Sequence, residues 1–223
     1  MSAQEPQTPS EPEELRLFPL NLVLFPGMAL PLRIFEERYK IMIEECLDED
    51  LPFGVLLIKE GPEVGSGAMP HTVGTIARIT QAERLEEGRF RLQTRGESRF
   101  RLREVTQDEP FLMGNVEYLE EENPGPLEDL TDSARDLLSE YWKILVCIKG
   151  GWVNDVETPQ EPVPLSYAVA QTVARPALVG QYLLQLSSAK ERLERAIPLL
   201  EERLGLAKEE LSKQRLYQGP RLN

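Results

Sequence analysis

The spacing of the apolar residues changes near residue 120, and this change constrains the fold more than any other feature of the sequence. Before it, short apolar runs alternate with charged residues and are broken by proline and glycine. A period of two sends successive side chains to opposite faces of a strand. After residue 126, apolar residues recur at steps of three and four, as on one face of a helix. We therefore expect an α+β protein, in which a small barrel-like β structure is followed by a four-helix bundle.

The first part is expected to contain one helix among its strands. Tyr39, Met42, Ile43 and Cys46 recur at helical steps between charged residues and should form the buried face of this helix. Pro31 places the second strand at an edge or a bulge of the sheet. The strands are expected over residues 15–20, 28–35, 53–58, 72–85, 90–105 and 111–119, with a loop over 61–70.

The second part is expected to form four helices. Thr131 can cap the first helix, and Ser188 forms a capping box with Glu191 at the start of the last one. Pro198 lies inside the last helical pattern, where it should kink or break the helix. The four helices are expected over residues 131–148, 164–173, 178–186 and 188–204.

Turn-forming residues and charge runs divide the chain into segments. Residues 1–13 combine proline and glutamate without any base, so this acidic tail should stay disordered. A β-rich subdomain is expected over 14–121, followed by a linker over 122–130 that is rich in proline and acidic residues. The helical subdomain is expected over 131–205, and a C-terminal tail over 206–223.

The composition disfavours several classes of protein. One His and two Cys fall short of the four ligands of a closed zinc site and of a disulfide framework. The longest apolar runs are too short to span a bilayer, and the first residues do not resemble a secretory signal. The net charge of −13 argues against general binding to nucleic acid. Cys46 and Cys147 lie in apolar patterns, as expected of reduced, buried thiols in a cytoplasmic protein.

No catalytic residue, metal or cofactor is expected. The glycine-rich loop over 61–70 lacks the lysine of a phosphate-binding loop, and no Gly-Lys pair occurs in the chain. Ser66, between two glycines, and His71, the lone histidine, are the best candidates for a nucleophile and its base. Both belong to one loop without an evident oxyanion hole, so we interpret them as ordinary loop residues.

Arginines are concentrated between Arg84 and Arg103. Seven arginines in this segment outnumber three glutamates and leave a local charge of +4. The residues at 95–98 are turn formers, so the segment is expected to fold into a hairpin over 89–103. A local excess of positive charge on an acidic chain suggests an alternative function, in which this hairpin contacts the backbone of RNA.

In this alternative, Arg91 and Arg101 are the candidate RNA contacts. The period of two places the arginines on one strand face and Phe90 and Phe100 on the opposite face, toward the core. Aromatic platforms for stacking bases are therefore missing from the arginine face. We favour a simpler interpretation, in which the arginines form a solvated face that opposes aggregation at a sheet edge.

Several short motifs follow one another in a fixed order. The first are Leu17-Phe18-Pro19-Leu20, Val23-Leu24-Phe25-Pro26-Gly27 and Leu30-Pro31-Leu32-Arg33-Ile34-Phe35-Glu36-Glu37-Arg38-Tyr39. They are followed by Phe53-Gly54-Val55, Glu63-Val64-Gly65, Val73-Gly74-Thr75-Ile76-Ala77, Gly88-Arg89-Phe90 and Gly96-Glu97-Ser98-Arg99-Phe100. The helical part adds Leu165-Ser166-Tyr167, Tyr182-Leu183-Leu184 and Glu191-Arg192-Leu193-Glu194. Over roughly residues 14–205, this order resembles the N-terminal substrate-recognition domain of Lon proteases.

The resemblance implies a PUA-like β-rich pseudo-barrel followed by a helical bundle, and a role in recognising unfolded or tagged polypeptide. A complete Lon protease continues into an ATPase and a Ser-Lys protease, whose nucleotide loop and catalytic dyad are not found in this sequence. We therefore expect a stand-alone, non-catalytic polypeptide-binding module, and any protease activity would be assigned to it by family alone. Such a module would act as an adaptor in protein quality control, with a protease or chaperone as partner. The net charge does not forbid a homodimer.

Apolar residues in loops are the candidate polypeptide contacts. Val64 and Met69 lie in the glycine-rich loop, and Trp152 and Val153 lie in the loop between two helices. Exposed Met and Trp side chains suit adaptable binding of varied apolar segments. We interpret the aromatic and proline residues of the first motifs as determinants of the fold: Phe18, Phe25, Pro26, Phe35 and Tyr39.

Overall fold

The computed structural model describes residues 13–65, 67–122 and 125–217, with side chains up to Gln214. The contacts between residues divide the chain into two compact units. Among the described residues, the β unit comprises Glu13–Leu24 together with Ala29–Leu119, and the helical unit comprises Phe25–Met28 together with those from Glu120 onward. None of the helices in the described ranges is both long and apolar enough to cross a membrane.

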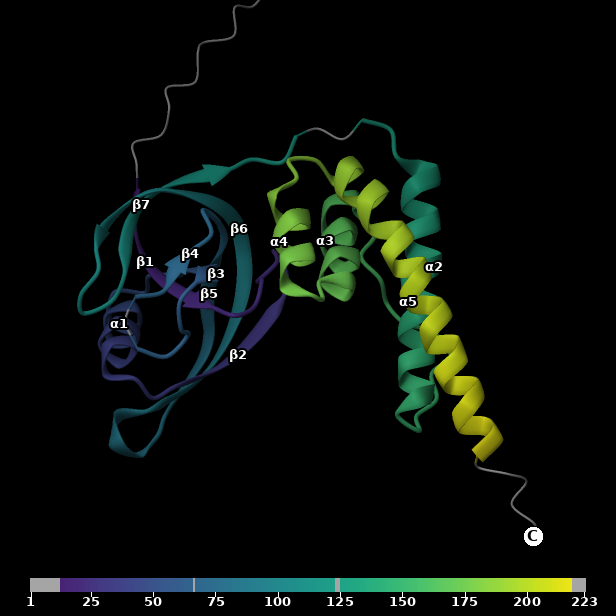
Figure 1. The fold of residues 1–223 in the computed structure, drawn as a ribbon, viewed down its shortest axis with the longest axis horizontal. Coiled ribbons are helices and arrows are strands. Elements are labelled where there is room, and N and C mark those ends of the chain that lie inside the picture. The colour runs from purple at the N-terminus through teal and green to yellow at the C-terminus, as the bar shows by residue number, and fades with distance from the viewer. Residues whose placement is uncertain (1–12, 66, 123–124, 218–223) are drawn as a thin grey trace, which may run out of the picture. The chain divides into compact units, whose positions relative to one another are not determined.

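The β unit is built on one sheet that closes into a barrel (Figure 1). Antiparallel pairing joins β1, β7, β6, β5 and β3 in that order, and parallel pairing between β1 and β3 closes the ring. Outside this ring, β2 pairs with β6 and β4 pairs with β3. The strands are β1 (Glu13–Leu20), β2 (Ala29–Ile34), β3 (Phe53–Glu60), β4 (Met69–Pro70), β5 (Val73–Arg84), β6 (Phe90–Gln107) and β7 (Met113–Leu119). The predicted α+β class with a β-rich pseudo-barrel is confirmed.

The barrel interior is filled by apolar side chains around the ring of Phe100. Gly54 and Gly74 leave room for this ring, because a Cβ atom on either glycine would lie within 2.9 Å of Phe100 Cζ. A bulkier residue would have to displace packed core atoms at either position. The buried cluster consists of Leu15, Leu17, Leu56, Ile76, Phe100, Leu102 and Val116.

Helix α1 (Glu37–Asp48) follows β2 and packs its apolar face against strands of the β unit, with Tyr39 beside Phe18 of β1. Arg16 of β1 fixes its last turn, since the guanidinium donates to Glu45 at 3.0 Å and to Glu49 at 3.2 Å. Its buried residues are the four that the spacing predicts, Tyr39, Met42, Ile43 and Cys46.

The hairpin predicted within the arginine-rich segment is wrong. β6 continues through residues 95–98, where Gly96 pairs with Ala77 of β5. The chain reverses earlier, in the 3-10 helix η1 (Glu86–Gly88), where Gly88 adopts a φ of 68° that favours glycine. β6 stays extended because β2 and then β7 pair along one edge while β5 pairs along the other. These pairings outweigh the local turn signal.

The glycine-rich segment over 61–70 ends in a short strand rather than remaining a loop throughout. Met69 and Pro70 form β4, and they pair with Glu60 and Ile58 of β3. This pairing tolerates a proline because β4 lies at the end of the sheet, where one side of its backbone needs no partner strand.

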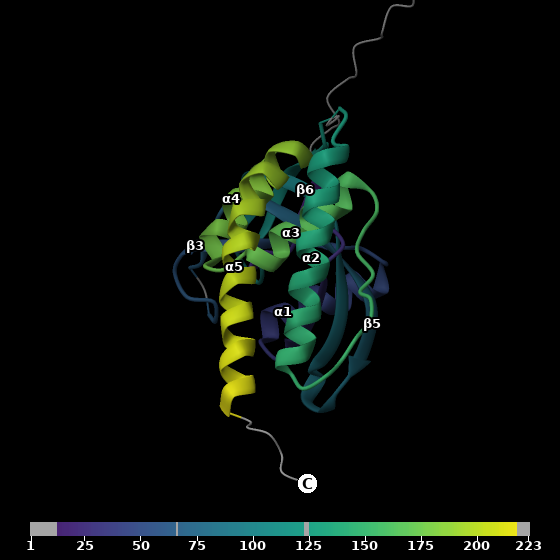
Figure 2. The same cartoon turned by 90° about the vertical axis from the view of Figure 1, so that its right-hand side faces the viewer.

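The helical unit contains α2 (Glu128–Ile148), α3 (Pro162–Val173), α4 (Ala177–Gln185) and α5 (Ala189–Tyr217). Helices α2 and α5 lie side by side and run in the same direction, as Figures 1 and 2 show. An ion pair of 2.7 Å between Lys208 of α5 and Glu140 of α2 joins their exposed sides. The apolar faces of the helices form a core of their own, which includes Leu138, Leu165, Leu183, Leu193 and Leu200.

The predicted start of the first helix of this unit is corrected by three residues. Helix α2 begins at Glu128, so Thr131 lies inside its first turn and does not cap it. The Thr131 hydroxyl instead donates to the carbonyl of Leu127 at 3.1 Å, and burial of the side chain favours this local bond. Glu128 and Asp129 in the first turn suit the positive end of the helix dipole. The last residues of the predicted linker are therefore helical.

The last helix is longer than predicted and is not broken at Pro198. Helix α5 continues to Tyr217, through a segment predicted as a C-terminal tail. Pro198 is exposed, so water can satisfy the carbonyl that loses its helical partner. Buried Ala196 and Leu200 hold the helix on either side of the proline. The start is as predicted in one respect, since the Ser188 hydroxyl accepts a bond from the Glu191 amide at 3.2 Å.

Candidate functional site

An open apolar pocket of about 380 Å³ lies in the β unit, between β2, α1 and the glycine-rich loop. Exposed Phe35 and Val64 stand at its rim, and buried Phe18 and Ile34 contribute to its walls. We call this hollow the apolar pocket. The residues that line it are Phe18, Leu20, Leu22, Leu30, Pro31, Leu32, Arg33, Ile34, Phe35, Glu36, Tyr39, Glu63 and Val64.

Strand β2 supplies one side of the apolar pocket and is an edge strand. One edge pairs with β6 from Ala29 to Ile34, and no other strand in the described part of the chain pairs with β2. The predicted edge position of Pro31 is confirmed. An edge of this kind presents backbone donors and acceptors beside the apolar pocket.

Hydrogen bonds hold the glycine-rich loop against the pocket. The carboxylate of Glu63 accepts bonds from Asn21, at 3.1 Å from the backbone amide and at 2.9 Å from the side-chain amide. The Glu36 carboxylate accepts a bond of 3.1 Å from the amide of Gly65. These two tethers lie on either side of Val64 in the sequence. They fix an exposed apolar side chain where it can contact a ligand in the pocket.

Aromatic packing builds the floor of the apolar pocket. The rings of Phe18 and Tyr39 lie 4.1 Å apart between centroids, and the Arg38 guanidinium lies 4.3 Å from the centroid of the Tyr39 ring. Burial raises the pKa of Tyr39 to about 12, with Arg38 lowering it and Glu36 and Glu63 raising it further. Tyr39 therefore remains a neutral phenol at physiological pH and serves as an apolar wall.

The candidate contact residues predicted from the sequence are distributed over both units. Val64 is 59% exposed and lines the apolar pocket, whereas Met69 is 55% exposed but does not line it. Trp152 is 77% exposed and Val153 is half-buried, and both lie in the helical unit, between α2 and α3. The apolar pocket thus contains one of the four candidates.

Phe35 is the most exposed aromatic residue that lines the apolar pocket, and the sequence interpretation did not identify it as a contact. It was expected to pack as a determinant of the fold, but its side chain is 56% exposed. The other expected determinants are buried or half-buried: Phe18, Phe25, Pro26 and Tyr39. Leu30 and Ile34 are buried on alternate positions of β2, and extending that period by one residue sends Phe35 outward. This alternation is the signal that identifies it.

The arginines of β6 and its neighbours mostly have acidic partners. Arg91 lies 2.5 Å from Glu83, and Arg103 pairs with Glu117. Arg101 is half-buried, and Arg99, which the period of two places on the solvent face, is buried. Arg99 lies beyond a register shift between β5 and β6, which interrupts the alternation. Paired arginines favour the interpretation of a solvated strand face over that of an RNA contact surface.

The structure gives a position to only one member of the candidate pair of Ser66 and His71. Ser66 lies outside the described residues. Burial, and to a smaller extent the charge of Lys59, lowers the pKa of His71, and its backbone amide donates to Leu57 at 2.8 Å. In the described ranges, no group of three or more His, Cys, Asp and Glu side chains could hold a metal ion.

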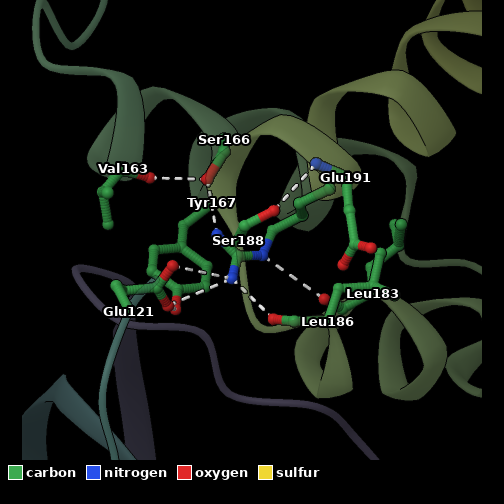
Figure 3. Close-up of polar contacts among 9 residues, drawn as sticks. Glu121, Val163, Ser166, Tyr167, Leu183, Leu186, Ser188 and Glu191 are labelled. Carbon is green, nitrogen blue, oxygen red and sulfur yellow. Dashed lines mark hydrogen bonds and ion pairs between the residues drawn. The ribbon is translucent and has the colours of Figure 1, made fainter. Parts of the chain in front are cut away.

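A cluster of buried polar side chains lies in the helical unit, around Arg192 of α5 (Figure 3). Arg192 is fully buried, and its Nη2 lies 3.1 Å from both carboxylate oxygens of Glu121, while its Nη1 donates to Ser166 at 2.7 Å. Its guanidinium also lies 3.9 Å from the centroid of the Tyr167 ring, whose hydroxyl donates to Glu121. These contacts satisfy each member from within the unit, so we interpret the cluster as structural.

Comparison with known proteins connects these observations to one family. A family model described as the ATP-dependent protease La (LON) substrate-binding domain matches residues 14–202. Lon protease 2 of Myxococcus xanthus is 27% identical over 202 residues, which cover 88% of this chain and 24% of that protein. The Lon protease of Anaeromyxobacter dehalogenans is 26% identical over 202 residues, with the same coverage. The chain thus spans about a quarter of the length of these relatives.

Solved structures support the same assignment. The Lon N-terminal domain protein from Xanthomonas campestris matches with a TM-score of 0.62 and 26% identity, over 82% of this chain and 96% of its own. The N-terminal domain of the Mycobacterium avium complex Lon protease shares the fold, with a TM-score of 0.62, 20% identity and coverage of 85% and 98%. The resemblance found in the sequence is confirmed: the chain belongs to the family of Lon substrate-binding domains.

Proposed function

We propose that the β unit binds extended segments of unfolded polypeptide, with an apolar side chain in the apolar pocket and the peptide backbone along the open edge of β2. The observation that carries this proposal is the apolar pocket itself, bounded by an edge strand and by exposed Phe35 and Val64. Membership of a substrate-binding domain family of an ATP-dependent protease supports polypeptide as the ligand.

The open edge of β2 suits the backbone of an extended peptide, and the apolar pocket suits one of its side chains. An edge strand offers backbone hydrogen bonds that do not depend on sequence, and a pocket beside it selects side chains. Full burial of one Leu or Phe side chain stabilises a complex by about 1.5–3 kcal/mol. A single anchor of this size supports weak, reversible capture of many sequences, which suits a recognition module.

The role that follows is binding without chemistry. We propose that the domain acts as an adaptor in cytoplasmic protein quality control, where a protease or a chaperone processes the captured polypeptide. The two cysteines, Cys46 and Cys147, are both free thiols, in keeping with a reducing compartment. Sedimentation of the purified chain tests whether two copies form a homodimer.

Fluorescence anisotropy with a labelled, chemically unfolded polypeptide tests the proposal in the absence of ATP. We expect saturable binding that Val64→Asp weakens by about tenfold, because a buried carboxylate replaces an apolar contact. Phe35→Ala should weaken binding to a similar extent. Val105→Asp is the matched control, since Val105 is also exposed on the β unit but does not line the apolar pocket.

Other outcomes would contradict the proposal. If binding is lost in Trp152→Ala or Met69→Asp and unchanged in Val64→Asp, the polypeptide site lies outside the apolar pocket. If the unmodified chain retains neither the unfolded polypeptide nor any member of an array of extended peptides, the proposed function is wrong.

A further inference from the structure

A second pocket, of about 290 Å³, adjoins the apolar pocket across Phe35. Three consecutive residues, Arg33, Ile34 and Phe35, line both pockets. We call this second hollow the arginine pocket. The residues that line it are Arg33, Ile34, Phe35, Leu85, Arg89, Phe90 and Arg91.

The two pockets differ in the charge of their linings. The arginine pocket has three guanidinium groups and no carboxylate among its lining residues. The lining of the apolar pocket contains Glu36 and Glu63 and shares one arginine, Arg33, with its neighbour. On a chain with a net charge of −13, a pocket whose charged lining residues are all cations is a local exception that favours an anionic ligand group.

One of the three arginines in the arginine pocket has no acidic partner in the described part of the chain. Arg91 lies 2.5 Å from Glu83, and Arg89 lies 3.5 Å from Glu87. Arg33 is exposed and forms no ion pair with any residue in the described part of the chain. Its guanidinium can therefore bind a carboxylate without first giving up another partner.

We propose that the arginine pocket receives an acidic side chain of the bound polypeptide, so that the β unit prefers segments in which Asp or Glu lies near an apolar residue. This inference rests on the proposed function, and it adds a sequence preference to it. The apolar side chain occupies the apolar pocket, and the carboxylate meets Arg33 on the other side of Phe35.

Strand geometry sets the expected spacing within the peptide. Side chains at positions i and i+2 of an extended segment point to the same side and lie about 7 Å apart. Such a pair can place one side chain on each side of the exposed Phe35 ring. A single residue between them would point away from the surface and should carry no preference.

The observations favour a peptide carboxylate over the phosphates of RNA. RNA binding through arginines depends on several cations that each neutralise a phosphate. Within the arginine pocket, Arg89 and Arg91 have acidic partners, and Arg84, the residue before the lining residue Leu85, is paired with Glu44. Arg33 is thus the pocket arginine without an acidic partner in the described chain, and a single carboxylate can match its one charge.

Matched peptides test this preference with the full chain. The probe is a short Gly/Ser peptide that carries one Leu and one Asp two positions away, on either side in separate peptides. It has an uncharged dansyl fluorophore at its N-terminus and an amide at its C-terminus, so that neither the label nor a terminal carboxylate competes for the arginine pocket. We expect replacement of Asp by Asn to weaken binding about three- to tenfold, and Lys to weaken it further.

Charge reversal supplies the decisive variant. Arg33→Glu should remove the preference for Asp and shift it toward the Lys peptide, whereas Arg103→Glu, outside both pockets, should leave the preference unchanged. Equal binding of the Asp, Asn and Lys peptides, with Val64→Asp still weakening all of them, would overturn the acidic preference but leave the proposed function intact. Failure of every peptide to bind, together with failure to retain the unfolded polypeptide, would overturn both. Retention of oligouridylate that Arg33→Glu abolishes, without a difference between peptides, would assign the arginine pocket to RNA instead.

Discussion

Replacement of Arg192 by Met tests whether the buried polar cluster stabilises the helical unit. The guanidinium joins Glu121, at the start of this unit, to Ser166 of α3 and to the carbonyl of Leu186 after α4. Figure 3 shows these groups converging on one side chain of α5. Met retains much of the apolar stem of Arg192, so the change removes mainly the charge and its hydrogen bonds. The Glu121 carboxylate would then lose its buried cation.

The structure sets the size of the expected effect. Removal of one partner from a buried ion pair costs about 3–5 kcal/mol. The Glu121 side chain is 22% exposed, so water can partly solvate the carboxylate that remains, and we expect the lower end of this range, about 3 kcal/mol. With a urea dependence of about 1–3 kcal/mol/M, the unfolding midpoint should fall by about 1–3 M. Both tryptophans, Trp142 and Trp152, lie in the helical unit, so their fluorescence reports its unfolding.

Controls separate the cluster from a general effect of removing an arginine from α5. Arg195 lies three residues further along the helix and is exposed, so Arg195→Met should change the free energy of unfolding by less than about 0.5 kcal/mol. Tyr167→Phe removes one hydroxyl donor to Glu121 and should cost about 1 kcal/mol. Equal midpoints for Arg192→Met and Arg195→Met would refute the reasoning. So would full additivity of Arg192→Met and Glu121→Gln, because residues in one network are expected to couple.

Further predictions concern the glycines and the thiols. Gly74→Ala should destabilise the β unit by about 1–3 kcal/mol or more, because the new Cβ would lie 2.3 Å from the carbonyl oxygen of Val55. Gly205→Ala should instead stabilise the helical unit by about 0.5–1 kcal/mol, because a Cβ at this position of α5 meets open space. Thermal unfolding followed by circular dichroism would compare the two variants. A thiol reagent at pH 8 should label half-buried Cys147 first and Cys46 only on unfolding, because burial raises the pKa of Cys46 to about 11. Labelling of Cys46 in the native chain would contradict this prediction. The pKa of Cys46 in the folded protein exceeds its ordinary value of 9.0, so the contribution of its protonated thiol to stability is complete below pH 9 and is lost as the pH rises toward 11. Over that interval, the urea midpoint of Cys46→Ala should therefore fall less than that of the unmodified chain.

Local spacing was sufficient to predict most elements of both units, because burial enforces it. The four residues on the buried face of α1 follow directly from steps of three and four, and β2 lies at an edge as Pro31 indicates. The hairpin at residues 95–98 was predicted wrongly because Gly96 is also compatible with extended backbone. Pairing of β6 with strands on both edges favours the extended strand over the hairpin turn. Such long-range pairing cannot be read from the sequence of the segment itself.

The candidate site was less predictable because it depends on how β2 joins the barrel. The parallel pairing of β1 with β3 closes the ring and leaves β2 attached by one edge alone within the described chain. An exposed edge invites pairing between copies of a protein, and Pro31 and Arg33 are residues that discourage it, by a missing donor and by charge. The same Arg33 lines both pockets, so protection of the edge and selection of the ligand fall to one side chain. A polypeptide whose carboxylate reaches the arginine pocket would neutralise the charge of Arg33. Its backbone could then pair with the open edge of β2, where the charge of Arg33 disfavours a second copy of the chain.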